Sequence, residues 1–154
     1  MHPIRLGIVI LMTAILQVAI DRLLSFSFRP DLLVILLVYL VTSTEGNWPI
    51  IAAFAVGFAA DLISLPVGPN TIAFGIAGSL LAMTRRSVTF DNPLLVALAV
   101  FAVCLVGGAI GQILAGFKQA VGAGAFKSLF WMSLASAVIG PYLYSILSVA
   151  SGFL

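Results

Sequence analysis

The sequence predicts an all-α integral membrane protein, a bundle of about six transmembrane helices. Two observations support this prediction. Of the 154 residues, 62% are hydrophobic and 8% are charged, whereas about a quarter of the residues of a soluble domain carry a charge. The apolar residues also fall into six runs that short polar or turn segments separate. Backbone polar groups in lipid must be bonded within their own segment, so such runs form helices.

Each predicted helix is bounded by charged or turn residues. The first has no small-x-small cleavage site after it, so we interpret it as a retained span and not as a signal peptide. The third and fifth begin at a proline, which suits the first turn of a helix. The sixth is interrupted at Gly140-Pro141, where we expect a kink because Pro141 has no N–H to donate. The predicted helices cover residues 6–20 (at most to 24), 31–44, 49–65, 71–84, 93–117 and 128–154.

The second, third and fourth predicted helices are short. The second has 13 uncharged residues, 32–44, or about 20 Å at 1.5 Å per residue. The hydrocarbon core of a bilayer is about 30 Å thick. These helices therefore either thin the membrane locally or lie shielded inside the bundle.

The composition excludes several classes of function. Seven basic and five acidic residues are too few to cover a soluble protein of this length. A net charge of +2 is too small to capture a polyanion. We therefore expect the chain to contact membrane lipid and to bind no nucleic acid. The length leaves no room for a separate soluble domain, and we treat residues 1–154 as one transmembrane domain.

The sequence also offers no constellation for catalysis. His2 is the one histidine and Cys104 the one cysteine, so neither a metal cluster nor a nucleophile-and-base pair is indicated. We predict no enzyme, no cofactor and no metal.

Asp61 is the one carboxylate inside an apolar run. It lies 12 residues after Pro49, about 18 Å along the helix and so near its end. We interpret it as structural, held by a salt bridge to Arg22 or Arg29 or by backbone amides of the following turn. A proton- or ion-carrying role is the alternative, and it would need further buried acids or histidines.

Other polar residues also suit structural roles. Asp31, after Pro30, is expected to stabilise the positive end of the second helix. Gln17 and Gln112 are expected to form hydrogen bonds between helices.

Small residues recur on the predicted helix faces at three- or four-residue spacing. The pairs are Ala53 and Gly57, Gly75 and Gly78, and Gly107 and Gly111. Such spacing lets two helices approach closely. We favour packing within the chain, and docking of a partner's transmembrane helix is the alternative.

Three segments occur in a characteristic order: RPDLLVILLVYL at 29–40, AFAVGFAADL at 53–62 and PVGPNT at 66–71. This set resembles the rod shape-determining protein MreD family over about residues 29–86. The shared pattern is a Pro-Asp-Leu-Leu opening with a later tyrosine, then Gly-x-x-x-Asp-Leu, then a Pro-x-Gly turn. The motif positions are Pro30, Asp31, Tyr39, Gly57, Asp61, Pro66 and Gly68. The chain departs from the family where Phe58 and Pro69 stand at positions that are often leucine.

The resemblance implies a non-catalytic scaffold of the bacterial cell-wall elongation machinery in the inner membrane, involved in the regulation of cell shape. It implies that the bundle holds the transmembrane helix of MreC in apolar grooves, and is linked through it to MreB, RodA and the partner transpeptidase. It further implies six helices, similar to the substrate-capture subunits of energy-coupling-factor transporters. Both termini would be cytoplasmic, and Asp31, Asp61 and the 66–68 turn would face the periplasm.

Two other functions remain open. A vitamin-capture transporter subunit fits the size and the helix number, and a proton-coupled carrier would use Asp61. Basic residues do not decide the orientation, because three lie on one predicted face and four on the other. The densest pair, Arg85-Arg86, favours a cytoplasmic location for that loop and for both termini.

Overall fold

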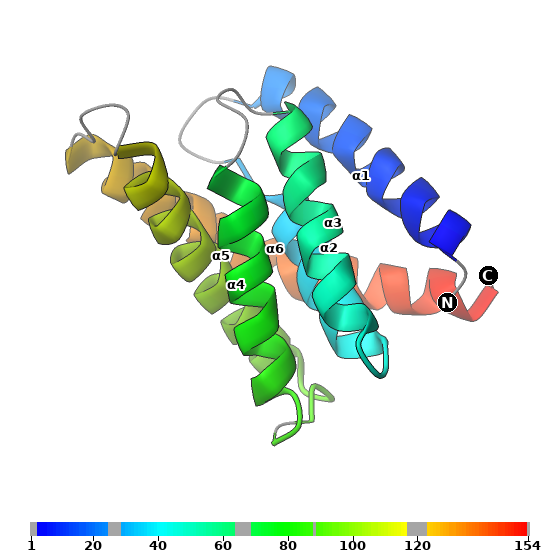
Figure 1. Cartoon of the computed structure of the whole chain (residues 1–154). Coiled ribbons are helices and arrows are strands. Elements are labelled where there is room, and N and C mark those ends of the chain that lie inside the picture. The colour runs from blue at the N-terminus through cyan, green and yellow to red at the C-terminus, as the bar shows by residue number, and fades with distance from the viewer. Residues whose placement is uncertain (1–2, 25–28, 64–68, 88, 117–122, 154) are drawn as a thin grey trace.

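The computed structural model describes residues 3–24, 29–63, 69–87, 89–116 and 123–153, which form six helices (Figure 1). The all-helical prediction is confirmed. Three helices contain apolar stretches long enough to cross a membrane: Ile4–Leu23, Pro93–Leu114 and Gly124–Ala150. The chain is therefore a multi-pass membrane protein. In chain order the helices are α1 (Pro3–Leu23), α2 (Leu32–Ser43), α3 (Trp48–Ile63), α4 (Pro69–Thr84), α5 (Pro93–Gly116) and α6 (Ala123–Phe153).

Helix α2 lies at the centre of the bundle and contacts each of the other five helices. Every residue from Leu32 to Val41 is buried. A helix that is apolar all round has no face that prefers water, so it suits a fully enclosed position. Of the two possibilities for this short helix, shielding inside the bundle is the correct one, and its length need not match the bilayer.

The other helices form an incomplete ring around α2. Contacts join α1 to α3, α3 to α4, α4 to α5, and α5 to α6. Within the described residues, α1 and α6 make no contact with each other. The ring therefore has one opening, which we call the α1–α6 seam.

The two ends of the bundle differ in what they carry. Both chain ends lie at the right of Figure 1, and we call the end of the bundle on this side the terminal end. It also carries the α2–α3 turn, where Gly46 adopts a φ of +72°, a left-handed conformation that glycine takes at little cost. The opposite end carries the start of α2 and the start of α4. The motif residues Pro66 and Gly68 lie outside the described residues.

Helices α1 and α4 begin at Pro3 and Pro69, slightly before the predicted residues 6 and 71. The larger corrections concern α6. Helix α6 begins at Ala123 and not at residue 128, because alanine in the Gly- and Ala-rich segment favours helix. Helix α6 is also continuous through Pro141, so the helix is not broken there, and the expected kink stays a prediction. A proline is tolerated inside a membrane helix because neighbouring groups compensate for the hydrogen bond that it removes.

Small residues bring α3 and α4 close together. A Cβ added to Gly57 would lie 2.8 Å from the Asn70 carbonyl oxygen and 2.8 Å from the Thr71 Cα. One added to Gly78 would collide with the side chain of Ala53, which is itself fully buried. The glycines let two backbones approach more closely than any larger residue would allow.

Other glycines accommodate aromatic or polar side chains of the same chain. A Cβ at Gly75 would collide with the ring of Phe54 on α3. At Gly107 it would lie 3.1 Å from the ring of Phe74 on α4, and at Gly111 it would lie 3.5 Å from Asn70 Oδ1. In this structure the small-residue faces thus pack within the chain.

We predict that Gly57→Ala lowers the free energy of unfolding by about 1–3 kcal/mol, because the new methyl group meets backbone atoms that cannot rotate away. Thermal unfolding of the detergent-solubilised chain measures the effect. The matched control is Gly7→Ala in α1, where an added Cβ meets no atom within 4 Å. That variant should keep or gain stability, since alanine favours helix. Equal melting temperatures for the two variants would contradict close α3–α4 contact as the reason for Gly57.

Candidate functional site

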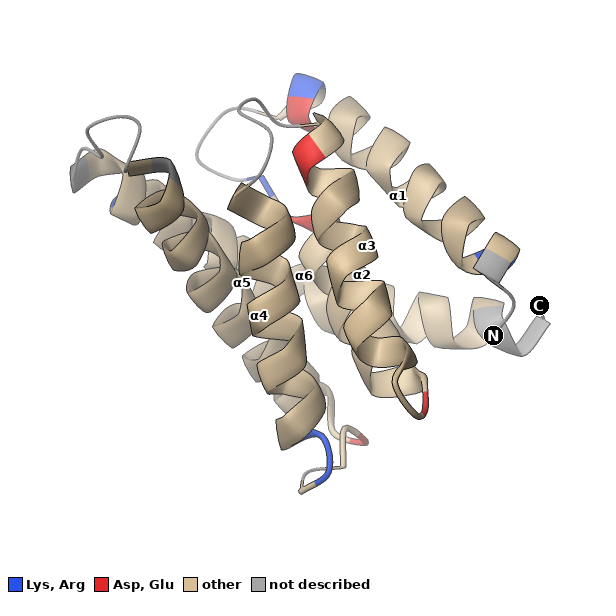
Figure 2. Cartoon of the chain, in the orientation of Figure 1, with Lys and Arg blue, Asp and Glu red and all other residues tan. Residues whose placement is uncertain are grey.

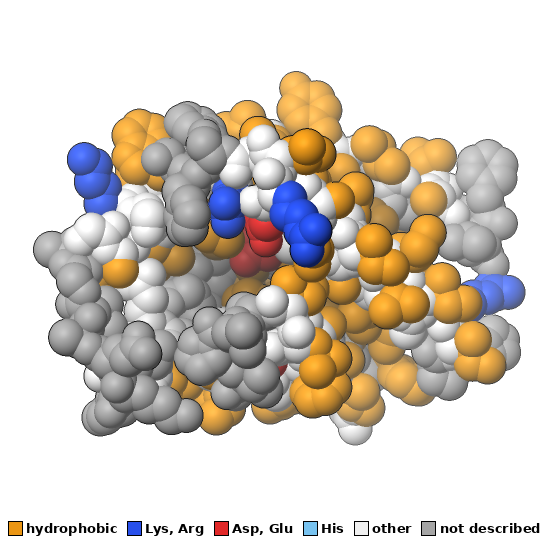
Figure 3. All heavy atoms as spheres, turned by 90° about the horizontal axis from the view of Figure 1, so that it is seen from above, with side chains coloured by type: hydrophobic (Ala, Val, Ile, Leu, Met, Phe, Trp, Pro, Cys, Tyr) orange, Lys and Arg blue, Asp and Glu red, His pale blue; other side chains and the backbone are white. Residues whose placement is uncertain are grey.

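The charged residues lie mainly near helix ends, with uncharged helix between them (Figure 2). Seen from the opposite end, acidic side chains occupy a hollow near the middle of the face, with basic side chains beside them (Figure 3). The polar contacts at this end, and one at the terminal end, define the candidate site.

Asp31 caps the first turn of α2. Its Oδ1 accepts hydrogen bonds from the backbone N–H groups of Leu33 (3.1 Å) and Val34 (3.2 Å). This confirms the predicted role of Asp31 at the positive end of the helix. Its own backbone N–H donates to Ser136 Oγ on α6 at 2.8 Å. The start of α2 is therefore bonded directly to α6, and Pro30 directly precedes it.

Gln17 bonds the same helix start to α1. Its Oε1 accepts from the Leu32 N–H at 2.7 Å, and its Nε2 donates to the Pro30 carbonyl at 3.3 Å and to Asp21 Oδ1 at 3.0 Å. The expected bond between helices is confirmed. Together with Ser136, Gln17 satisfies backbone groups that would otherwise be unpaired inside the bundle.

Gln112 confirms the same expectation between α5 and α6. Its Nε2 donates to the Ala125 carbonyl at 3.2 Å. Its Oε1 is buried and has no hydrogen-bond partner within the described ranges.

Asp61 caps α4 from the neighbouring helix. The side chain is 1% exposed and accepts from the backbone N–H groups of Asn70 (3.0 Å) and Thr71 (2.8 Å) and from the Thr71 hydroxyl. These amides lie in the first turn of α4, where the helix has free N–H groups and a positive dipole. The predicted bond to backbone amides after the turn is confirmed, and it is contact with the helix that explains a buried carboxylate here.

Arg85 caps the C-terminal end of α2, opposite the end that Asp31 caps. From the end of α4, its Nη1 donates to the Val41 carbonyl at 2.6 Å and to the Thr44 carbonyl. A cation on the last carbonyls of a helix satisfies them and complements the negative end of its dipole. The sequence indicated Arg85 only as part of a basic pair that favours a cytoplasmic loop, and its bonds to the end of α2 were not predicted.

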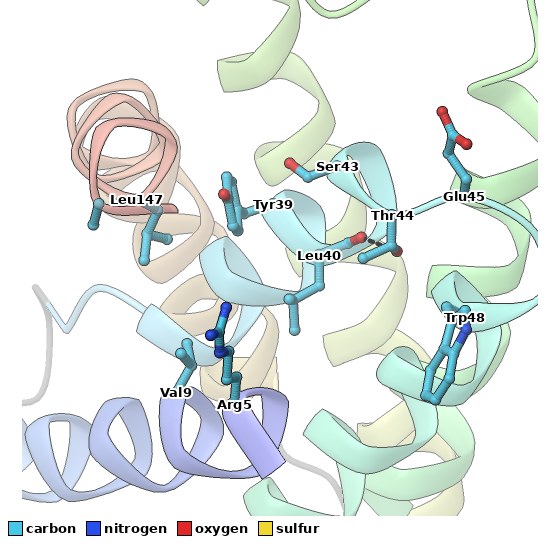
Figure 4. A pocket seen from close by; sticks show the side chains of 10 residues that line it. Arg5, Val9, Tyr39, Leu40, Ser43, Thr44, Glu45, Trp48 and Leu147 are labelled. Atoms are coloured by element: carbon cyan, nitrogen blue, oxygen red, sulfur yellow. Dashed lines mark hydrogen bonds between the residues drawn. The ribbon is translucent and has the colours of Figure 1, made fainter. Parts of the chain in front are cut away.

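A cavity of about 550 Å³ opens at the terminal end, beside α2. Figure 4 shows Arg5 and Val9 of α1 and Leu147 of α6 around it, with Tyr39 of α2 between them. The motif residue Tyr39 is thus placed far along α2 from Asp31, which begins the same helix. Tyr39 and Asp31 therefore do not share one site.

The chemistry of these contacts is that of helix capping and helix packing. No group of three or more His, Cys, Asp or Glu side chains is close enough to hold a metal ion among the described residues. Asp31 and Asp61 each bond to backbone amides of a helix start. The arrangement fixes helices relative to one another.

Comparison with known proteins identifies one family. The model for rod shape-determining protein MreD matches residues 2–149, nearly the whole chain and well beyond the motif region. Neither a curated protein nor a solved structure matches significantly.

We predict that Asp61→Ala lowers the free energy of unfolding by about 1–3 kcal/mol, because the first-turn amides of α4 lose their acceptor inside the protein. Asp61→Asn should lose less, since its amide oxygen still accepts. Chemical or thermal unfolding in detergent measures both.

Asp91→Ala is the matched control, because Asp91 is exposed in the segment before α5. It should unfold like the wild type. An Asp61→Ala protein as stable as the Asp91→Ala protein would exclude the capping role.

Proposed function

The chain belongs to the MreD family of rod shape-determining proteins, and we propose that it is a scaffold of the cell-wall elongation machinery in the bacterial inner membrane. Members of this family are non-catalytic membrane proteins with a role in rod shape determination. The family match over residues 2–149 is the observation that carries the proposal. The capped, interlocked helices support it, because they suit a rigid support better than a reacting centre.

The proposed partner is the transmembrane helix of MreC. A partner helix has no direct access to Ala53, Gly78 or Gly107, since helices of the same chain cover them. An exposed apolar face is the better candidate.

We propose the outer face of α1 for this contact. Helix α1 contacts only α2 and α3 among the described helices, which leaves a long apolar row open. Ile8 is 56% exposed, Leu11 61% and Ile15 58%. These residues follow a helical spacing of three and four, so they lie on one face and can pack against a second membrane helix.

The wider assembly follows from the same proposal. Through MreC the scaffold is linked to MreB, RodA and the partner transpeptidase. With both termini cytoplasmic, the capped starts of α2 and α4 face the periplasm. We also propose that the helix bundle has a fold similar to that of the capture subunits of energy-coupling-factor transporters.

We predict that the chain copurifies with MreC and that a photoreactive residue at Leu11 or Ile15 crosslinks to it. The same residue at Leu98, which is 56% exposed on α5, is the matched control and should give no crosslink. Copurification with crosslinks from Leu98 alone would reject the α1 face and keep the function. Two separately folded proteins that fail to associate would reject the function itself.

A further inference from the structure

We propose that the cavity at the terminal end of the α1–α6 seam binds a zwitterionic aminophospholipid. Arg5 binds its phosphate, and Glu45 binds its primary ammonium group. This ligand site is separate from the proposed partner face on the outside of α1.

The place of the cavity in the ring is the first argument. Its walls come from the two helices that do not contact each other, with Val9 on α1 and Leu147 on α6, and from Tyr39 on the central helix. Wherever two neighbouring helices pack directly, their side chains fill the space between them. Here that contact is absent within the described residues, and about 550 Å³ remains beside α2. This volume is within the range of small-molecule sites.

The apolar lining is the second argument. Tyr39 is 6% exposed and packs edge-on against Tyr144 of α6, with ring centroids 5.4 Å apart. Ile146, which precedes the lining residue Leu147 on α6, is 62% exposed and so faces the acyl chains of the bilayer. An acyl chain can therefore enter the seam from the side without leaving an apolar environment.

The polar rim is the third argument. Arg5 extends from α1 towards Tyr39 and Leu40, while Glu45 and Trp48 stand on the side away from α1 (Figure 4). A guanidinium group offers paired donors that match phosphate oxygens. A carboxylate accepts hydrogen bonds from an ammonium group, and a tryptophan ring suits the headgroup level.

These two charges discriminate between lipid classes. Phosphatidylglycerol offers the same phosphate to Arg5, but its glycerol is neutral and gives Glu45 no cation to bind. A choline headgroup carries a positive charge but has no N–H to donate to the carboxylate. A primary ammonium beside a phosphate complements both side chains.

The test uses the full chain, purified in detergent and stripped of lipid. Dioleoyl phosphatidylethanolamine, phosphatidylcholine and phosphatidylglycerol are titrated separately, and native mass spectrometry counts the bound lipids. We expect the ethanolamine lipid to bind about tenfold more tightly than either of the others. Arg5→Gln should weaken binding of all three, and Glu45→Gln should remove the preference for ethanolamine over choline. Arg86→Gln, an exposed arginine at the same end, is the matched control and should change neither.

A separate variant tests the cavity itself. Leu147→Trp places a larger side chain in the cavity and should reduce lipid binding while thermal unfolding without lipid stays close to that of the wild type. Equal binding of all three lipids by the wild type overturns the proposal. So does a preference for ethanolamine that Glu45→Gln leaves intact, or unchanged binding in a folded Leu147→Trp protein.

Discussion

A helix buried along almost its whole length needs hydrogen-bond partners for both of its ends. The first N–H groups and the last carbonyls of any helix have no partner within it, and neither lipid nor an apolar interior supplies one. At the start of α2, Asp31 accepts from two N–H groups, and Gln17 on α1 and Ser136 on α6 bond to the same turn. At its end the partner is Arg85, directly after α4. The positions of those helices are therefore coupled to the ends of α2.

This constraint explains how so apolar a chain uses its few charges. Asp31, Asp61 and Arg85 each bond to backbone groups at a helix end. The Asp61 and Arg85 side chains thus join different parts of the fold, whereas the Asp31 carboxylate caps the helix that follows it. A bundle organised in this way holds its helices in a defined arrangement, as a non-catalytic shape-determining protein requires. The same arrangement leaves the seam between α1 and α6, because α2 alone connects those two helices.

Much of this organisation could be predicted from local signals. Asp31 beside Pro30 indicates a helix start, and Asp61 near the end of its helix indicates a bond to the turn that follows. The role of Ser136 could not be predicted, since a serine in α6 looks like any small packing residue and its partner Asp31 is 105 positions away. Arg85 likewise reaches a carbonyl 44 positions away. Such pairings, like the seam, depend on how the helices are arranged in space, which periodicity and composition do not encode.

The lengths of the outer helices have a consequence for the surrounding bilayer. Helices α3 and α4 have 16 residues each and expose Phe58 and Ile76, whereas α5 and α6 have 24 and 31 residues and expose Leu98 and Val138. At 1.5 Å per residue these are about 24 Å on one side and about 36–46 Å on the other. A bilayer that matches both sides is thinner beside α3 and α4 than beside α5 and α6, even when the longer helices tilt. We therefore expect a gradient of bilayer thickness around the molecule, which favours neighbours with short spans beside α3 and α4.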